Sequence, residues 1–585
     1  MNLKHYSILF CIFLFASCAN RGIGPQGGPK DTIPPKVVKE LPENGTVNYT
    51  GKTVTILFDE YVQLDNVAAN LMICPPQRQQ PEIKQVGKTV KLTFEDPLLD
   101  STTYSIDFGS AICDFHEKNP LKNYFIAFST GPEIDTLEVF GHVYNAEDLN
   151  PVSGVVVGLQ ANLDDSAFTT QPMTRISKTN EKGHFGIHNI KKGVYRLYGL
   201  GDVSSDYMFQ PGEALAWSDS LVTPVSEVDS AGNVYVGPSD LVLYYFKENK
   251  TRRAFMRARR EEAHSIVLTF SAPQDSMPRI TALDSVSMER VYIQPSDRKD
   301  TITLWLRDSS LISRDSIRFE MTYYRTDSVY NLELATDTIT ALYRKPNMTA
   351  KVAENKRRQA EARRVEIRSN ARQKMDVYDT LYIASSLPID SIVADSILLR
   401  QKIDSTRWRN LPIRLALRDS SHTSYWLLCN LEKGAEYELR VDSNAVWDIY
   451  GKSNREKVLP LSLKNDDEYA TLTVKMANYR PEMRLQVLDD KDKVLRDVQA
   501  EANTVLHYLA PTSYYLRMYL DLDGDGKWTT GSWEQKRQPE PVYYFPSKLS
   551  LKANWEFEET FDYTAKPQAE SKPAEIIKDA GSTKK

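Results

Sequence analysis

"KTVTILF" (Lys52 to Phe58) and "KTVKLTF" (Lys88 to Phe94) are the two stretches that decide the fold class of this chain. In both, apolar residues alternate with Thr or Lys, which places every second side chain on the same face of an extended strand. Pro, Asn, Gly and Asp fill the gaps between such stretches, and long helical periodicity is almost absent. The pattern predicts an all-β protein made of tandem β-sandwich modules.

Length and composition are those of several ordinary folded domains. The 585 residues are enough for four or five domains of about 100–150 residues each. The formal net charge is only -5, so the chain has no basic footprint and no nucleic-acid partner is expected. Histidine is scarce, at eight residues, which disfavours a His-built metal or general-base site.

The N-terminal segment "MNLKHYSILFCIFLFASCAN" has the features of an export signal. Its apolar run, "ILFCIFLF", is too short to span a hydrocarbon core of about 30 Å. Small residues precede Cys18 as in the bacterial lipobox, so we expect residues 1–17 to be a lipoprotein signal peptide and Cys18 to carry lipid. An ordinary signal peptide with a coincidental cysteine is the alternative. Residues 18–34, rich in Gly and Pro, predict a flexible tether.

Residues 35–131 contain "PPKVVKELPENGTV", "VTILFDEYVQL" and, at their end, "FIAFSTG". These motifs resemble the bacterial Ig-like domain of S-layer proteins (the SbsA type), in which P-x-N-G opens the domain and F-S-T-G closes it. With the preceding "GGPKDTIPPKVV", the segment resembles the opening of Ig-like-domain lipoproteins of the Bacteroidota. The resemblance is strongest over residues 25–131 and weaker over the remainder. It implies an envelope location but no activity.

Residues 134–245 resemble a prealbumin-like (carboxypeptidase-regulatory) β-sandwich, a module type that is usually a structural accessory. The motifs are "VFGHV", "NPVSGVVVG" and "TNEKGHFGIHNIKKGVYRLY". Later in the chain Tyr514 precedes Asp521 by the same seven residues that separate Tyr195 from Asp202. Residues 466–563 are therefore predicted to be a second prealbumin-like sandwich.

The Ig-like pattern also recurs. "SAICDFHEKN" (Ser110 to Asn119) and "NAVWDIYGKSN" (Asn444 to Asn454) share an Ala, a branched residue and an Asp, which predicts a second Ig-like domain over residues 375–464. Between the copies, "SIVLTFSAP" opens a third predicted β-sandwich, with Ig-like features, over residues 264–345.

Two basic stretches interrupt the β pattern. The first, "KENKTRRAFMRARREEAH", precedes the third sandwich, and the second follows it. The second stretch lies in residues 346–374, is rich in Ala, Glu and Arg, and predicts a basic helical linker. Such a linker is solvated or touches anionic lipid headgroups or an acidic polymer. Residues 564–585 offer little apolar surface and predict a disordered tail.

Cysteine usage agrees with export. Cys74 and Cys113 fall in one module, and a disulfide between them is possible in an oxidising compartment. The alternative is that they are small buried side chains, which is more usual for a sparse, odd set of cysteines.

The stretch "DLDGDGKWTTGSW" (Asp521 to Trp533) is the candidate metal site. Its candidate calcium ligands are Asp521, Asp523, Asp525 and Lys527, spaced as in the first half of an EF-hand loop. Position twelve of that loop is Ser532 instead of Glu, and the earlier copy, "DVSSD", lacks the middle acid. A calcium site and a plain Asp/Gly turn both stay open, with the turn favoured. No other cofactor is expected.

Known catalytic templates are absent from the sequence. It contains no P-loop, HExxH, GxSxG or CxxC motif, and no GxGxxG in a strand–helix context. The adjacent acids of "FDEY" point to opposite faces of a strand, so they are poorly placed to flank one bond. Asp114 and Asp448 are expected to accept backbone hydrogen bonds in turns. We therefore expect no catalytic residue and no enzymatic activity.

The sequence thus predicts a cell-envelope lipoprotein that acts as a multi-domain structural or adhesive scaffold. Its partners would be the membrane, through the lipid, and an unknown envelope protein or glycan. The residues after Cys18, "ANRGIG", lack the acidic run associated with surface export in related lipoproteins, which favours the periplasmic face of the outer membrane. One alternative is an assembly factor that recruits partners by β-strand addition. The other is a glycan-binding lipoprotein of a polysaccharide-uptake system, with five candidate stacking residues: Trp408, Trp426, Trp528, Trp533 and Trp555.

Overall fold

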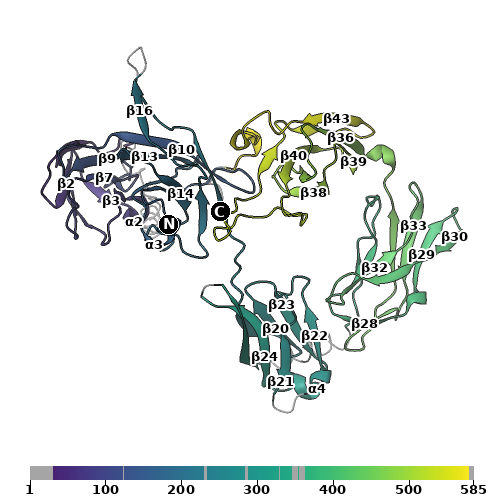
Figure 1. Cartoon of the computed structure of the whole chain (residues 1–585). Helices are drawn as coiled ribbons and strands as arrows, with labels where there is room; N and C mark the ends of the chain where they lie inside the picture. Colours follow the sequence, from purple (N-terminus) through teal and green to yellow (C-terminus); the bar gives the residue numbers. More distant parts are fainter. Residues whose placement is uncertain are drawn as a thin grey trace, which may run out of the picture. The chain divides into compact units, whose positions relative to one another are not determined.

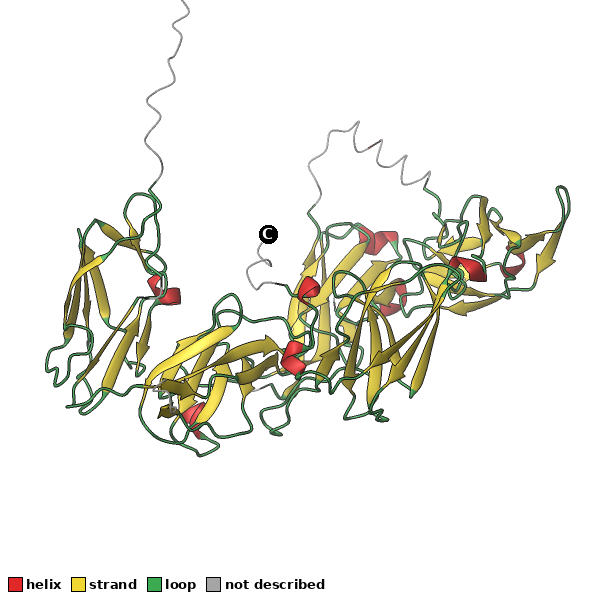
Figure 2. Ribbon diagram, turned by 90° about the horizontal axis from the view of Figure 1, so that it is seen from above, coloured by secondary structure: helices red, strands yellow, loops and turns green. Residues whose placement is uncertain are grey.

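The computed structural model describes residues 31–578 except 123, 229–233, 284–286, 329, 345–353 and 355–362. Strands dominate this part of the chain and form many small, mostly antiparallel sheets (Figure 1). The helices are few and short (Figure 2). The predicted all-β fold class, with tandem Ig-like modules, is confirmed. Contacts divide the chain into two compact units: residues up to 145 with 150–245, and residues 146–149 with 246–578.

The two stretches that open the sequence argument pair with each other. Strands β2 (Thr53–Phe58) and β6 (Thr89–Thr93) are antiparallel neighbours, with Val54 opposite Leu92 and Ile56 opposite Val90. All four side chains are fully buried, because the alternation turns them to one face. The first module has the sheets β1-β2-β6-β5, β4-β7-β9 and β3-β8. Its other elements are β1 (Val37–Leu41), β3 (Val62–Leu64), α2 (Val67–Asn70), β4 (Met72–Cys74), β5 (Glu82–Val86), β7 (Thr103–Asp107), β8 (Ile112–Asp114) and β9 (Phe125–Ser129).

The strand order of the two larger sheets recurs in a third and a fourth module; the described strands of the third include no counterpart of β3-β8, and the fourth adds β30 at a sheet edge. The third has sheets β19-β20-β23-β22 and β21-β24-β25; the fourth has β26-β27-β32-β31, β30-β29-β33-β35 and β28-β34. Third-module elements are β19 (Phe255–Arg259), β20 (Ser265–Phe270), β21 (Arg279–Ala282), η1 (Met288–Arg290), β22 (Val291–Pro295), β23 (Thr301–Leu306), α4 (Ser309–Ile312), β24 (Ser316–Thr326) and β25 (Leu332–Leu342). Fourth-module elements are β26 (Arg368–Ser369), β27 (Tyr382–Ala384), β28 (Ile389–Ile392), η2 (Ala394–Ser396), β29 (Ile397–Lys402), β30 (Trp408–Leu411), β31 (Arg414–Leu417), β32 (Ser424–Leu428), β33 (Glu436–Val441), β34 (Val446–Asp448) and β35 (Lys457–Ser462).

The second and last modules share a different topology. The order β12-β11-β14-β15-β18-β10-β13 of the second corresponds to β38-β37-β40-β41 and β43-β36-β39 in the last. In each, the first strand runs parallel to the final one, β10 with β18 and β36 with β43. Second-module elements are β10 (Leu137–Asn145), β11 (Val156–Gln160), α3 (Ala167–Thr170), β12 (Arg175–Lys178), β13 (His184–Ile190), β14 (Arg196–Leu200), β15 (Ala214–Trp217), β16 (Val225–Val228), β17 (Val234–Gly237) and β18 (Leu241–Lys247). Last-module elements are η3 (Asp466–Glu468), β36 (Ala470–Met476), β37 (Met483–Leu488), β38 (Val494–Gln499), β39 (Asn503–Leu509), β40 (Ser513–Leu520), β41 (Val542–Tyr544), β42 (Leu549–Ser550) and β43 (Glu556–Phe561).

Each module has its own hydrophobic core. In the described part of the chain, clusters of buried side chains lie within residues 54–128, 139–243, 266–341, 365–463 and 470–561. The module boundaries stay predictions, but the structure differs from the sequence interpretation at both basic stretches. Phe255–Arg259 is strand β19, paired with β20, although it lies in the first stretch. Residues 363–374 are not helical: Val365 and Ile367 enter the fourth core, and the alternation in "VEIR" explains this. The rest of the predicted helical linker lies outside the described residues, apart from residue 354.

The prediction of a disordered tail is wrong for residues 564–578. This segment contains η4 (Gln568–Glu570) and η5 (Ala574–Ile576), and Ile576 is buried. Lys572 Nζ lies 2.7 Å from Asp492 Oδ2, and each of these side chains is only 1% exposed. The Tyr544 hydroxyl donates to Asp492 Oδ1 at 3.0 Å. A buried charge pair therefore holds the segment, where composition indicated too little apolar surface. No helix in the described part of the chain is long and apolar enough to cross a membrane.

Candidate functional site

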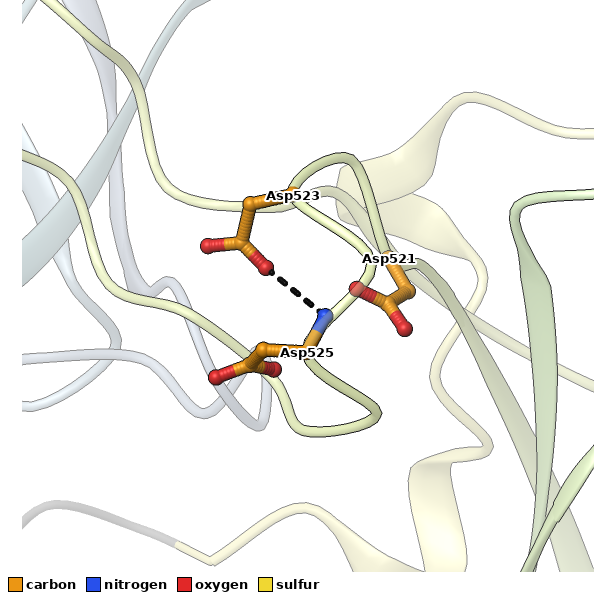
Figure 3. A group of neighbouring side chains, drawn as sticks. All are labelled: Asp521, Asp523 and Asp525. Carbon is orange, nitrogen blue, oxygen red and sulfur yellow. Dashed lines mark hydrogen bonds between the residues drawn. The ribbon is translucent and has the colours of Figure 1, made fainter.

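Three carboxylates converge in the Asp/Gly loop that follows β40 (Figure 3). One oxygen from each of Asp521, Asp523 and Asp525 lies within 4.8 Å of the others. Asp521 is buried, and the other two are exposed. Among the described residues, no other group of three His, Cys, Asp or Glu side chains is gathered so closely. The structure thus brings together three of the four predicted ligands; Lys527 joins the loop through its N–H, which donates to Asp525 Oδ1 at 2.7 Å.

Hydrogen bonds within the loop explain this convergence without a cation. Asp521 accepts the N–H of Gly524 at 2.8 Å on one oxygen and that of Gly526 at 2.9 Å on the other. Both glycines have φ near +75° (74° and 77°), a conformation that side-chain-bearing residues rarely adopt. Asp523 accepts the N–H of Asp525 at 3.3 Å, the bond drawn in Figure 3. The acids therefore act as turn-forming residues.

Glu540 is a further residue of this site that was not predicted from the sequence. Its carboxylate is 1% exposed and accepts the N–H of Leu522 at 2.6 Å and of Thr529 at 2.8 Å. Burial raises the pKa of the Glu540 carboxyl, and the nearby charges of Asp523 and Asp521 raise it further. We call the pair formed by Asp521 and Glu540, with the backbone groups they bind, the Asp–Glu clasp.

The second module contains the same clasp. There Glu213 accepts the N–H of Val203 and of Gln210, each at 3.0 Å, and Asp202 accepts the N–H of Ser205 at 2.7 Å and of Tyr207 at 3.2 Å. The signal in the sequence is "QPGE" (210–213) beside "QPE" (538–540). The position of Asp523 is taken here by Ser204. Two modules thus fold the loop with the same acid pair, and Asp523 is the addition in the last module.

The loop provides part of a calcium ligand set. Calcium takes six to eight oxygens in proteins, and three carboxylates are in place. Ser532, at position twelve, is engaged in backbone hydrogen bonds with Arg537. Glu534 lies 3.5 Å from Lys250 Nζ, with its side chain 78% exposed. The Arg537 guanidinium lies 3.9 Å from Asp523 and already supplies a positive charge there. Calcium remains a hypothesis, and the turn interpretation has the direct geometric support.

The remaining predicted site residues do not form a site together. Cys74 and Cys113 are free, buried thiols, which agrees with the favoured alternative of small buried side chains and not with the possible disulfide. The two cysteines lie on strands of different sheets, β4 and β8. Each has its own hydrogen-bond partner: Cys74 Sγ donates to the Ile176 carbonyl at 3.1 Å, and Cys113 Sγ donates to the Gln63 carbonyl at 3.6 Å. Cys18 lies outside the described residues.

Asp114 and Asp448 play the expected turn roles. Asp114 accepts three backbone N–H groups, from Glu117, Lys118 and Asn119. Asp448 accepts the N–H of Tyr450 and of Lys452, each at 2.9 Å. Neither arrangement resembles a catalytic carboxylate.

The predicted tryptophans are scattered. Trp408 and Trp426 belong to different sheets of the fourth module, and Trp528 donates to the Glu540 carbonyl at 2.9 Å. Lys536 Nζ lies 3.0 Å from the ring centre of Trp533, and Trp555 is 56% exposed. They do not build one stacking surface.

A continuous row of rings lies instead on β9, β10 and β13. Successive ring centres are 5.8, 5.6, 6.2, 5.2 and 6.0 Å apart. In order, the rings are Phe125, His188, Phe140, His184, His142 and Tyr144, and we call them the aromatic ribbon. A cavity of about 270 Å³ adjoins its Phe125 end and is also lined by Asp107 and Cys74. Burial raises the pKa of the Asp107 carboxyl, although the His188 ring acts to lower it. The ribbon requires partners from two modules, so no single sequence motif indicated it.

Comparison with known proteins supports the N-terminal assignment. The family model described as bacterial Ig-like domain matches residues 31–130. The first module is a bacterial Ig-like domain. The match confirms this part of the predicted resemblance, over the segment that carries the quoted motifs. No curated protein matches the chain.

Several solved structures match parts of the chain at low similarity. Domains 1–6 of the surface layer protein SbsC are 10% identical, with 89% of this chain and 68% of that chain covered and a TM-score of 0.14. An L,D-transpeptidase from Mycobacterium smegmatis is 13% identical, with 35% of this chain and 73% of that chain covered and a TM-score of 0.13. Latent PorU from Porphyromonas gingivalis is 12% identical, with 51% of this chain and 32% of that chain covered and a TM-score of 0.17. Similarities this low have no bearing on function.

Proposed function

We propose that this protein is a non-enzymatic scaffold of the bacterial cell envelope, anchored by lipid at Cys18. The observation that carries the proposal is the repetition of two strand orders along the described chain, three times in Ig-like and twice in prealbumin-like modules. Repetition of complete sandwiches with separate cores adds modules to a chain without creating a shared catalytic centre. The bacterial Ig-like domain at residues 31–130 and the lipobox-like segment support the envelope location.

The polar groups that the structure describes fit this role. The clasp residues and the turn acids Asp114 and Asp448 each accept backbone N–H groups of their own loop. A hydrolase would need paired acids or a nucleophile–base pair facing a common point in a pocket. The groups described above serve the fold, which supports a scaffold over an enzyme.

Anchoring is tested with Cys18→Ser in the full-length chain, with Cys11→Ser as the matched control inside the signal segment. We expect the wild type and the control to sediment with the outer membrane and to carry a lipid-modified N-terminal cysteine by mass spectrometry. The Cys18→Ser variant should lose both properties. A wild-type chain that is found in the soluble fraction without lipid contradicts the proposal.

Membrane topology has a separate test. We propose the periplasmic face of the outer membrane, since "ANRGIG" lacks an acidic run after Cys18. Protease added to intact cells should leave the chain whole, and the same protease should cleave it once the outer membrane is permeabilised. Cleavage in intact cells would place the modules on the cell surface instead.

Glycan binding is a second candidate function, and the aromatic ribbon is the observation that favours it. The C–H face of a sugar stacks on aromatic rings, while imidazole nitrogens and carboxylates bind its hydroxyls. Glu138, paired with His188 at 2.8 Å, and Asp107 at the adjoining cavity supply such carboxylates. The ribbon therefore offers an extended surface for a polysaccharide chain, of the kind the scattered tryptophans lack.

Affinity electrophoresis in gels containing soluble xylan, mannan or starch tests this candidate. We expect one of these polysaccharides to retard the full chain, and Phe140→Ala, which removes the central ring, to abolish the retardation. Trp555→Ala is the matched control, because it removes an exposed ring outside the ribbon. Mobility that is unchanged in all three gels removes the glycan-binding candidate.

A further inference from the structure

One end of the first module exposes a cluster of large apolar side chains. Tyr61 is 60% exposed, Val86 76% and Phe115 56%. They lie at the same end, since the Phe115 N–H donates to the Tyr61 carbonyl at 3.0 Å and the Val62 N–H donates to the carbonyl of Gly87, the residue after Val86, at 3.3 Å. Lys88 Nζ lies 5.7 Å from the Tyr61 ring centre. We call Tyr61, Val86 and Phe115 the aromatic tip. Exposed rings that are not needed for the core indicate an interaction surface.

The fourth module has an equivalent end, because its strand order is the same. The pair β28–β34 corresponds to β3–β8, and Asp448 occupies the position of Asp114. The correspondence holds at the level of single hydrogen bonds: the Ile449 N–H donates to the Pro388 carbonyl at 3.2 Å, as Phe115 does to Tyr61. The residue after Ile449 is Tyr450, which takes the place of His116.

In the fourth module this end is covered by the third module. The Tyr450 hydroxyl donates to the His264 carbonyl at 3.3 Å, and the two ring centres are 5.8 Å apart. Arg307 of the third module pairs with Asp390 at 3.4 Å. The covering surface consists of the end of a β-sandwich that presents an imidazole, stacked on Trp305, and a guanidinium. The repeat therefore shows what kind of surface fits an end of this type.

The chain reaches the first module at the same end. The Lys36 N–H donates to Asp59 at 2.8 Å, and the Asn119 side chain donates to the Asp31 carbonyl at 3.0 Å. A tether that leads to the membrane would thus leave the module beside the aromatic tip. Among the described residues of this compact unit, no second sandwich covers Tyr61 or Phe115, since both remain more than half exposed.

Charge selects the occupant of the tip. Four carboxylates lie near it, Asp59, Glu60, Asp114 and Glu117, and the Lys88 ammonium lies over the Tyr61 ring. Burial raises the pKa of the Glu60 carboxyl, and the neighbouring acids Asp114 and Asp59 raise it further. This local field disfavours anionic lipid headgroups and the same tip of a second copy, and it favours a cationic surface.

We propose that the aromatic tip docks the end of a β-sandwich in a second envelope protein, one that presents Arg or Lys beside a histidine or aromatic ring. The rings of Tyr61 and Phe115 then provide the apolar contact, and Glu60 and Glu117 pair with the cations at its rim. A contact made by three apolar side chains and two acids is small, so the two proteins would bind and release each other in the envelope. It goes beyond the scaffold role by naming where the scaffold binds.

Cysteine labelling tests the proposal in the intact protein. The full-length Phe115→Cys variant, in a Cys429→Ser background, is labelled with N-ethylmaleimide in living cells and after purification. We expect labelling at residue 115 to be at least tenfold slower in cells. Leu99→Cys is the matched control, since Leu99 is 60% exposed in the loop beyond β6, at the far end of that strand from Lys88. It should react at the same rate in both settings.

Two further arms identify what protects the tip. Protection by a protein persists when detergent dissolves the membrane, and Glu60→Lys with Glu117→Lys should abolish it without changing the Tm. Equal labelling rates in cells and in the purified chain overturn the proposal. So do protection that detergent removes, which means lipid, and protection that survives the charge reversal. Loss of membrane sedimentation in the wild type is a different outcome and contradicts the anchored scaffold instead.

Discussion

Asp521 and Asp523 differ in what they hold together within one loop. Asp521 is buried and accepts two backbone N–H groups, whereas Asp523 is exposed and accepts one at 3.3 Å. We expect Asp521→Ala to lower the free energy of unfolding of the last module by about 1–3 kcal/mol, because buried donors lose their acceptor. Asp523→Ala should change it by less than about 0.5 kcal/mol. Thermal unfolding of the full chain measures both.

The same pair of variants decides between the turn and calcium. If the loop is a turn, adding millimolar calcium or a chelator leaves the Tm of the last module unchanged. Glu534→Ala, which removes a largely exposed acid outside the cluster, is the control for nonspecific charge effects. A calcium-dependent rise in Tm that persists in the control and disappears in Asp523→Ala would assign the loop to a cation.

Asp114 provides a prediction with a definite pH dependence. Burial acts to raise its pKa, but the N–H donors of Asn119, Glu117 and Lys118 outweigh that effect and lower it. A carboxyl whose folded pKa is lowered stabilises the fold above its unfolded pKa, near 3.8, and loses this contribution as the pH falls through the folded value. Asp114→Asn should therefore destabilise the first module at pH 7 and have a smaller effect near pH 3. A difference in Tm that is equal at both pH values would contradict this.

At the scale of elements, the C-terminal segment contributes one half of a buried charge pair, Lys572 with Asp492. Removing the Lys572 side chain leaves Asp492 buried without its cation, which costs about 3–5 kcal/mol in comparable pairs. We expect Lys572→Ala to release residues 564–578 from the last module, and limited proteolysis to cut there. The double variant Lys572→Met with Asp492→Leu keeps the volume without the charges and should resist cleavage better. Equal resistance of the wild type and Lys572→Ala would show that the pair does not hold the segment.

The elements that sequence predicts well are those whose signal is local. Val54 and Ile56 on β2, or Val90 and Leu92 on β6, reveal a buried face through alternation within seven residues. Lys572 could not be read in this way, because its partner lies 80 residues earlier in the chain. Glu540 was missed for the same reason: it binds Leu522, 18 residues away, and its role becomes visible only beside Glu213.

At the scale of the whole molecule, separate cores should make the modules unfold separately. The clusters of buried side chains described above share no member among the described residues, so a change in one of these cores has no direct route to another. We expect calorimetry of the full chain to show more than one transition. Asp521→Ala should shift only the transition of the last module, and Asp114→Asn only that of the first. The third and fourth modules, joined through Tyr450 and His264, are the pair we expect to be coupled, and Tyr450→Ala should separate their transitions. A single transition that every variant shifts as a whole would show that contacts between modules outweigh the cores.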